Sequence, residues 1–230
     1  MTNIVPLNKE AHRNLCIRPT GGEDKNFVAV IVNEFSHLVL HYPIVFSKDP
    51  ETGAFYCGAM LGIDTGENLL RDEGVGIYRP LTVQRGPFYI QGDELAIDLD
   101  HPRVGSGQPL FTETGEPTAY LKSIIGLFRD LVPGMERTKV FINTLLNLKL
   151  IEPMDVELAF DDGSKRRLEG LYTINSEALR ALPDAAVLDL FKRGYLQLVY
   201  LMIASLKQIP ALAQKKNNSL SKGELAGALG

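Results

Sequence analysis

The chain has 230 residues, of which 45% are hydrophobic and 23% are charged, a balance typical of soluble globular proteins with a substantial core. Its formal net charge of −4 argues against a nucleic-acid-binding protein, which normally carries a basic surface. The two cysteines, Cys16 and Cys57, form neither a CxxC pair nor a metal-ligand cluster, so we expect free thiols in a reducing compartment. Because the first residues lack a basic region followed by an apolar run, we expect a cytoplasmic protein.

The N-terminal part of the chain predicts an arm, a strand and a helix in that order. Residues 1–26 are polar and are broken by prolines and glycines, which predicts an extended arm. The β-branched run at 27–32 predicts a strand. Asn33 can cap the helix that follows through its side-chain oxygen. Pro43 ends that helix because it lacks an N–H and crowds the preceding turn.

Two hairpins are predicted in the first half of the chain. A strand at 44–46 is followed by turn residues at 49–53 and by a partner strand at 54–62. Further on, residues 87–91 and 94–99 have the pattern of two strands joined by a turn at Gly92-Asp93. The many glycines in this region predict strands and irregular structure in place of helices.

The periodicity of the apolar residues then changes from that of strands to that of helices. Residues 117–132 and 138–150 each carry apolar side chains at helical spacing, and Pro133-Gly134 is expected to break the two helices apart. A late hairpin is predicted at 156–160 and 166–174, because the first arm alternates and Asp-Gly supplies its turn.

The C-terminal part of the chain is predicted to be helical. Asn175 or Ser176 can cap a short helix that ends at Pro183, and a second helix runs from Asp184 to Phe191. Residues 195–209 are the most apolar stretch, but it is shorter than the roughly 20 residues that a membrane span requires, so we expect a core helix and no transmembrane segment. The composition of residues 214–230 predicts a disordered tail.

Together these elements predict an α+β fold. We expect a mostly antiparallel N-terminal sheet packed with a C-terminal helical layer that contains one late β-hairpin. We also expect a single compact domain over residues 1–213, because no linker accompanies the change of period near Pro117.

The most clustered titratable residues are Glu34, His37 and His41, which would share one face of a helix. Such groups on neighbouring turns can reach one metal ion, so a metal site is one interpretation. Partly exposed polar residues of a surface helix are the other interpretation, and the one we favour, since the spacing matches no metal-hydrolase motif. We therefore expect no metal and no cofactor.

A second candidate group consists of Asn68, Tyr78 and Arg85. The Arg85 guanidinium lies between turn residues and two strands, where it could hold a carboxylate or phosphate of a ligand or partner. The alternative is a structural anchor, and we expect Glu34 and Arg85 to form a buried pair. The sequence contains neither a phosphate-binding loop nor a Gly-x-Ser-x-Gly elbow. Cys57 is more readily explained as a buried inert thiol than as a nucleophile.

The order of several short motifs resembles the SapC family of bacterial proteins. The matching text runs from about residue 5 to residue 212, and its most specific part contains Tyr78, Pro80, Arg85, Pro87 and Phe88. The other matching pieces are Pro6-Leu7-Asn8, Glu10, His12, Arg13, Leu15, Glu34-Phe35, the run from Tyr42 to Phe46, Gly62, Asn68-Leu69, Gly107, the run from Pro109 to Phe111, the run from Gly115 to Pro117, the run from Gly170 to Tyr172, and the run from Gly194 to Leu206. One departure is Ile77, where the family pattern has tryptophan.

The resemblance implies an accessory role and no defined catalytic residues. Family members tend to be encoded near TonB-dependent receptors, flavin-dependent tryptophan-halogenase-like proteins and cupin-like proteins. A non-enzymatic binding protein is therefore expected, which acts with such a partner enzyme or with a small ligand in nutrient uptake or in the modification of a small molecule or peptide. Its binding residues would be Glu34, Tyr42, Asn68, Tyr78 and Arg85. The alternative is an enzyme with a polar site near Glu34, His37, His41 and Arg85.

Overall fold

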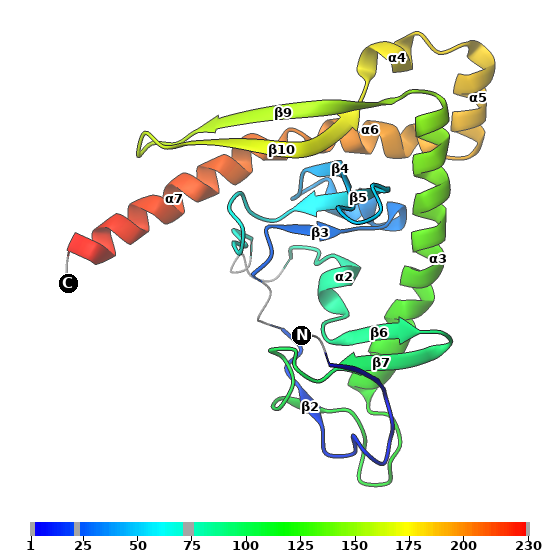
Figure 1. Cartoon of the computed structure of the whole chain (residues 1–230), viewed down its shortest axis with the longest axis vertical. Helices are drawn as coiled ribbons and strands as arrows, with labels where there is room; N and C mark the ends of the chain where they lie inside the picture. The colour runs from blue at the N-terminus through cyan, green and yellow to red at the C-terminus, as the bar shows by residue number, and fades with distance from the viewer. Residues whose placement is uncertain (1–2, 21–23, 71–75, 229–230) are drawn as a thin grey trace. The chain divides into compact units, whose positions relative to one another are not determined.

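The computed structural model of the chain describes residues 3–20, 24–70 and 76–228, with side chains as far as Ser221 (Figure 1). Parts of the expected N-terminal arm (1–2 and 21–23) and the last two residues of the expected tail lie outside the described residues. The combination of helices with antiparallel sheets confirms the predicted α+β class.

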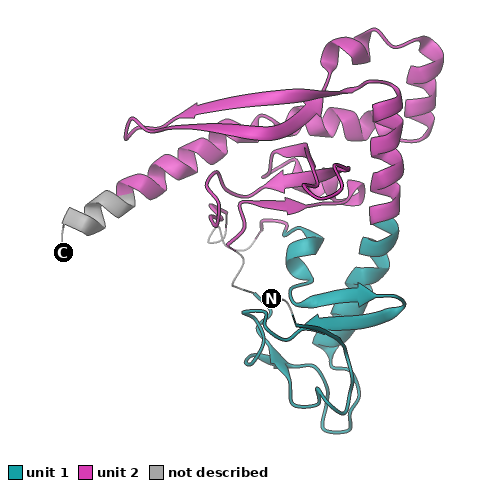
Figure 2. Cartoon of the chain, viewed as in Figure 1, with its two compact units in different colours: residues 1–23, 79–134 teal, residues 24–78, 135–230 magenta. Residues whose placement is uncertain are grey.

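The chain forms two compact units, whereas the sequence predicts one compact domain (Figure 2). Unit 1 consists of residues 1–23 and 79–134, and unit 2 consists of residues 24–78 and 135–230. Each unit therefore combines two separate segments of the chain. The second boundary falls inside one continuous helix, so no linker composition marks it in the sequence.

Unit 1 contains two small antiparallel sheets. Its three-stranded sheet has the order β1-β7-β6, and a two-stranded sheet pairs β2 with β8. The bounds of these elements and of the short helix in this unit are β1 Ile4–Pro6, β2 Cys16–Ile17, α2 Leu81–Gln84, β6 Phe88–Gln91, β7 Glu94–Asp98 and β8 Gln108–Pro109. The predicted hairpin around Gly92 is confirmed. The segment expected to be an extended arm instead contributes β1 and β2 to these sheets.

Unit 2 is built on a five-stranded antiparallel sheet with the order β3-β5-β4-β10-β9. Its strands are β3 Phe27–Ala29, β4 Ile44–Lys48, β5 Phe55–Met60, β9 Ile151–Ala159 and β10 Lys165–Ile174. The late hairpin, β9–β10, joins the N-terminal strands because Leu171 and Tyr172 pair with Ser47 and Phe46. The predicted late hairpin is therefore part of the main sheet, not an element of the helical layer.

Local turn chemistry explains why both predicted hairpins of unit 2 form. Asp49 Oδ1 accepts hydrogen bonds from the backbone of Glu51 and Thr52, and Gly53 has the positive φ (68°) that glycine tolerates best. The turn between β9 and β10 uses Gly163 in the same way, at φ 81°. These short-range interactions are encoded within a few residues, which makes them readable from the sequence.

A single helix, α3 (Ala119–Asn147), replaces the two helices predicted on either side of Pro133-Gly134. Proline removes one helical hydrogen-bond donor, at a cost that packing of the rest of the helix can exceed. Buried side chains continue on both sides of the proline, at Leu131, Thr138 and Phe141. The apolar face is therefore maintained through Pro133, and the prediction of a break was wrong.

Four helices follow the sheet: α4 Ser176–Arg180, α5 Asp184–Lys192, α6 Tyr195–Ser205 and α7 Gln208–Ala228. Asn175 caps α4 by accepting a hydrogen bond from the Ala178 N–H, as its side chain predicts. The tail expected to be disordered from residue 214 lies in α7. Leu212 and Lys216 on α7 are buried, and Asn217 accepts a hydrogen bond from the backbone of Asp161, so tertiary contacts hold the first half of this helix.

The helical stretch Tyr195–Ser221 is long and apolar enough, by length and composition only, to cross a membrane. The helical stretch is longer than the residues 195–209 that the sequence predicts, because the chain makes a short turn at 206–207 and continues as α7. Of its most apolar window, 22% is buried. The buried residues of α6 are Val199, Met202 and Ser205, and this helix packs on β4 and β10.

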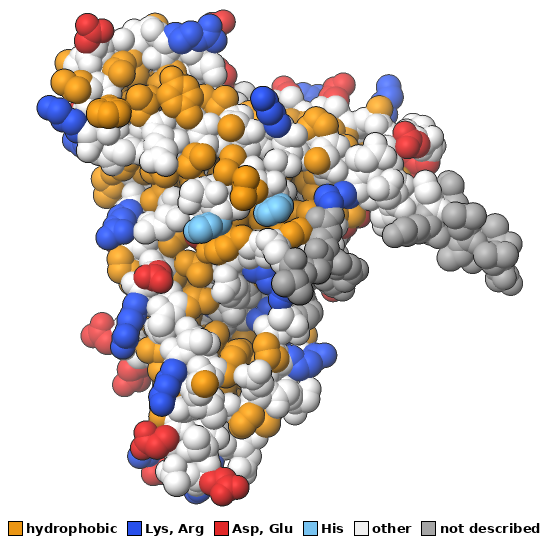
Figure 3. Space-filling view, turned by 180° about the vertical axis from the view of Figure 1, so that it is seen from behind, with side chains coloured by type: hydrophobic (Ala, Val, Ile, Leu, Met, Phe, Trp, Pro, Cys, Tyr) orange, Lys and Arg blue, Asp and Glu red, His pale blue; other side chains and the backbone are white. Residues whose placement is uncertain are grey.

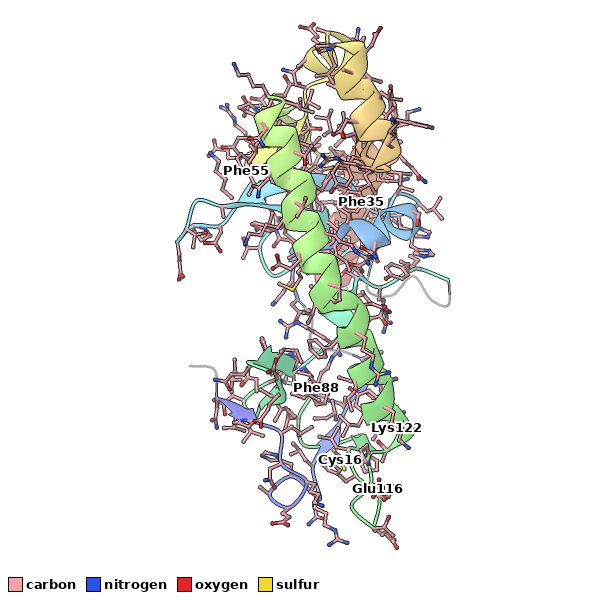
Figure 4. All side chains as sticks on the ribbon, turned by 90° about the vertical axis from the view of Figure 1, so that its right-hand side faces the viewer. Cys16, Phe35, Phe55, Phe88, Glu116 and Lys122 are labelled. Atoms are coloured by element: carbon pink, nitrogen blue, oxygen red, sulfur yellow. The ribbon has the colours of Figure 1, made fainter. Side chains whose placement is uncertain are left out.

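An aromatic cluster connects α1 (Phe35–Leu38) to the helices of unit 2. Phe35 is fully buried and lies edge-to-face with Phe141 of α3, with ring centroids 6.3 Å apart (Figure 4). Phe141 meets Tyr195 of α6 in the same manner at 5.3 Å. These contacts add the specific geometry of aromatic pairs to apolar burial, and they fix the segment that carries Glu34.

Candidate functional site

Glu34 lies at the end of a one-turn 3-10 helix, η1 (Val32–Glu34), which leads directly into α1. The segment is shorter than the helix that the sequence predicts, and Asn33 lies inside its first turn instead of capping it. Glu34 Oε2 accepts a hydrogen bond of 3.0 Å from the Ile31 N–H, which otherwise would be an unpaired donor at the start of the helix. The side chain is 1% exposed.

Tyr78 and Tyr42 are linked to Glu34 by hydrogen bonds. The Tyr78 hydroxyl donates a hydrogen bond of 3.1 Å to Glu34 Oε1, and the Tyr42 hydroxyl donates one of 2.8 Å to the Tyr78 carbonyl. A fourth residue, Thr138 of α3, accepts the Val32 N–H at 3.0 Å. The structure therefore brings together three of the five candidate residues, Glu34, Tyr42 and Tyr78, in one partly buried hydrogen-bonded network.

His37 adds an aromatic contact on the outer side of this network. Its imidazole stacks on the Tyr78 ring with 4.9 Å between centroids and 21° between planes, and it is exposed. His41 lies in the turn after α1, with its ring edge-to-face on Tyr42. Within the described part of the chain, no three or more His, Cys, Asp or Glu side chains gather to hold a metal ion. The alternative metal site at Glu34, His37 and His41 is thus not assembled, because α1 ends before His41.

The other two candidate residues have contacts of their own. Asn68 Oδ1 accepts a hydrogen bond from the Leu70 N–H and so shapes its own loop in unit 2. Arg85 belongs to unit 1, where its Nη1 donates to the Phe88 carbonyl at 2.6 Å and its guanidinium lies 4.0 Å from the centre of the Tyr89 ring. The predicted pairing of Glu34 with Arg85 stays a prediction, since the two residues belong to different units.

A network of charged residues that the sequence does not reveal also lies in unit 2. Lys216 Nζ is 2.9 Å from Asp64 Oδ2 and 2.6 Å from Glu67 Oε1, and Arg166 Nε is 2.8 Å from Asp64 Oδ1. Its members come from α7, β10 and the loop after β5. The hydrogen bond from Lys216 is the main reason why the pKa of Asp64 is lowered from its ordinary value. This network connects three elements and explains the order of α7.

Burial argues directly against a role of Cys57 as a nucleophile. The thiol lies inside β5 and is 1% exposed. Burial disfavours the thiolate and raises the pKa of Cys57 well above its ordinary range. A substrate therefore meets neither an accessible sulfur nor an ionised one at this position.

Several large apolar side chains are exposed on α5 and α6. Leu188 and Phe191 of α5 are 50% and 68% exposed, and Tyr200 of α6 is 56% exposed. The two helices pack against each other, and we call the exposed side that carries these residues the α5–α6 surface. Figure 3 shows hydrophobic side chains gathered over this part of unit 2 with charged side chains of both signs at the margin.

The comparison with protein families decides the family of the chain. A model of the SapC family matches residues 7–212 of the 230 residues. The chain belongs to the SapC family. The SapC match includes segments of both units and the whole of the network around Glu34. No curated protein and no solved structure matches the chain.

The SapC resemblance recognised from short motifs is thus confirmed, whereas a binding role of Glu34, Tyr42 and Tyr78 stays a prediction. Thr138 and Lys216 were missed. Thr138 is 106 residues from Val32, and Lys216 is 149 residues from Glu67. Contacts between residues so far apart in the sequence cannot be predicted from local residue spacing. No sequence motif marks a threonine or lysine that will be buried.

Proposed function

We propose that this SapC protein is a non-enzymatic, cytoplasmic accessory protein that binds a partner protein through the α5–α6 surface. The partner class that the family resemblance favours is a flavin-dependent halogenase-like or cupin-like enzyme, in a pathway of nutrient uptake or of small-molecule or peptide modification. The observation that carries the proposal is the exposure of Leu188, Phe191 and Tyr200 on two adjacent helices. Exposed apolar groups that gather in this way are typical of protein interaction sites.

The geometry around Glu34 favours binding over catalysis. The Glu34 carboxyl is almost completely buried and accepts hydrogen bonds from Ile31 and Tyr78, so its oxygens serve the fold. Arg85 donates to a backbone carbonyl and stacks on Tyr89. A catalytic acid or base must be within reach of a substrate, and these contacts give no such access to Glu34.

The charges near the α5–α6 surface favour a protein over a lipid bilayer. Asp184 and Asp189 are exposed on α5, and carboxylates there oppose an anionic membrane surface. Lys192 follows Phe191, and Arg193 is paired with Asp189 at 3.0 Å. A partner with an apolar pocket and both charge signs at its rim fits this surface best.

The test measures binding of the purified chain to a purified halogenase-like or cupin-like protein from the same organism by isothermal titration calorimetry. Phe191→Ser should weaken binding at least about tenfold, since hot-spot aromatic residues often contribute 2 kcal/mol or more. Met135→Ser is the matched control, because Met135 is 58% exposed on α3 and lies outside the α5–α6 surface. Equal binding by both variants, or no binding to either protein class, would overturn the proposal.

A flotation assay with vesicles of neutral and anionic phospholipids distinguishes a membrane from a protein as the ligand of the α5–α6 surface. The protein should remain in the soluble fraction. Flotation that is lost in Phe191→Ser would replace the protein partner with a membrane as the ligand of the α5–α6 surface.

A further inference from the structure

The strand β9 lies at the edge of the five-stranded sheet and, among the strands that the structure describes, pairs with β10 alone (Figure 1). It is nine residues long, whereas the strand at the opposite edge, β3, has three residues. All backbone hydrogen bonds described for residues 151–159 belong to the ladder with β10. In an antiparallel pair, every second residue of an edge strand points its N–H and C=O away from the partner, so β9 presents a row of such groups.

The side chains of β9 alternate between two different faces. Met154, Val156 and Leu158 are half-buried, whereas the residues between them, Asp155 and Glu157, are exposed. A strand that pairs with β9 would therefore meet apolar side chains on one face and carboxylates on the other. Asp155 lies 3.4 Å from Arg167 of β10, but its side chain is 73% exposed and so remains open to a second cation. The complementary sequence alternates apolar residues with lysine or arginine.

We propose that β9 is a docking site for an extended segment of a partner protein with alternating apolar and basic residues, which adds a sixth strand to the sheet. This mode of recognition obtains affinity from main-chain hydrogen bonds and specificity from alternate side chains. The site is separate from the α5–α6 surface, so the proposal does not depend on the function proposed above.

The charges of β9 argue against a second copy of this chain as the occupant. Antiparallel pairing of two copies about the middle of the strand brings Asp155 opposite Asp155, or Asp155 opposite Glu157. Like charges directly opposite each other destabilise a strand pair. Pro153 further restricts pairing, because it offers no N–H. The same carboxylates attract a basic strand, so they exclude one kind of partner and select another.

The probe is a nine-residue peptide of alternating valine and lysine with blocked ends and a fluorescent label. Fluorescence anisotropy gives its affinity for the full chain, and hydrogen exchange read by mass spectrometry locates the binding site. The expected result is slower exchange in the segment 151–159 and no change in the segment 184–205. A peptide with glutamate in place of each lysine should not bind.

Two charge reversals provide a matched pair of variants. Glu157→Lys lies on the edge strand, and Glu169→Lys makes the same change on β10, which already has neighbours on both sides. Glu157→Lys should weaken binding of the lysine peptide by about 2- to 10-fold, as expected for replacing attraction by repulsion at the surface, and Glu169→Lys should change it less.

Three results would overturn the proposal. One is an equal loss of peptide binding in Glu157→Lys and Glu169→Lys, which would indicate that the lysine peptide is attracted by the overall charge of the β9–β10 hairpin. Another is peptide binding without slower exchange in 151–159. The third is a chain that forms dimers in sedimentation experiments with 151–159 protected, which would make a second copy the occupant.

Discussion

The Tyr78 hydroxyl donates its hydrogen bond to Oε1 of Glu34, a carboxyl that is 1% exposed and lies 44 residues earlier in the chain. Because the other carboxyl oxygen accepts the Ile31 N–H, both oxygens of this buried group have partners. Buried polar groups are costly when a partner is removed, so the stability of unit 2 depends on this contact.

Tyr78→Phe is expected to lower the free energy of unfolding by about 1–3 kcal/mol, because it removes one hydrogen bond to a buried carboxyl while keeping the ring that stacks on His37. Urea denaturation followed by circular dichroism measures the change. Tyr200→Phe removes the hydroxyl of an exposed tyrosine and serves as the control. Equal midpoints for Tyr78→Phe and the unaltered protein would contradict a stabilising role of this hydrogen bond.

Met202→Ala is expected to destabilise the protein by about 2–5 kcal/mol, because Met202 is fully buried on the face of α6 that packs on the sheet. Leu198 and Leu201 of the same helix are only half-buried, so they are less informative positions. Tyr200→Ala, on the exposed face, should cost much less. A membrane helix makes the opposite forecast: Met202→Ala would leave the soluble fold unchanged and reduce flotation with vesicles.

Ser205→Ala tests the connection between α6 and β4. Ser205 Oγ accepts the Ile44 N–H at 2.9 Å, and both residues are fully buried. Alanine leaves that N–H without its partner, so a loss of about 1–3 kcal/mol is expected. Ser219→Ala, on the exposed side of α7, is the control. Thermal unfolding of both variants gives the comparison, and matching curves would show that water replaces the hydroxyl at no cost.

The Asp64–Lys216 contact predicts a component of stability that depends on pH. The Asp64 pKa is lowered in the folded state, chiefly by the hydrogen bond from Lys216, so this contribution is present above the ordinary value of 3.8 and is lost as the pH falls through the lower folded value. Lys216→Met should therefore be less stable than the unaltered protein at pH 6, and the difference should narrow as the pH falls below 4.

Urea titrations at a series of pH values measure this difference. Lys207→Met provides the control, because Lys207 is exposed. The two proteins are compared by their free energies of unfolding. If the difference between the unaltered protein and Lys216→Met stays constant from pH 6 to pH 2, the Asp64–Lys216 contact is not the source of the pH dependence.

Cys57 is expected to resist thiol reagents in the folded protein. Burial both shields the sulfur and raises the pKa of the thiol, so little thiolate is present at neutral pH. In a Cys16→Ser variant, a chromogenic disulfide reagent should label no thiol until guanidinium is added, and one thiol afterwards. Rapid labelling under native conditions would show that β5 opens readily or that Cys57 is accessible.

The sequence predicted those parts of the fold that depend on neighbouring residues. The turns at Asp49 and Gly163 and the cap at Asn175 are local, and each was predicted correctly. The continuity of α3 through Pro133 was not predicted, because the packing that outweighs a proline involves residues distant in sequence. Order in α7 depends on Lys216 and its acidic partners, which belong to other elements.

The arrangement of the candidate residues could not be read from the sequence, and their role in binding stays a prediction. The family motifs indicated Glu34, Tyr42 and Tyr78, and the structure places them in one network. The expected helix through His41 was too long, since η1 and α1 together span only Val32–Leu38. A short apolar segment before a proline does not specify whether it forms two turns or three, so the relative positions of His37 and His41 could not be read from spacing.

The pairing of β4 with β10 has a consequence for how the chain folds during synthesis. Ser47 Oγ donates to the carbonyl of Gly170, 123 residues further along the chain. While a ribosome makes the protein, β4 and β5 emerge early, but the outer edge of β4 stays uncovered until the late hairpin has been made. Contacts of such high sequence separation slow folding and expose strands to wrong partners. We therefore expect the main sheet to close only after translation is nearly complete, with the nascent chain depending on chaperones until then.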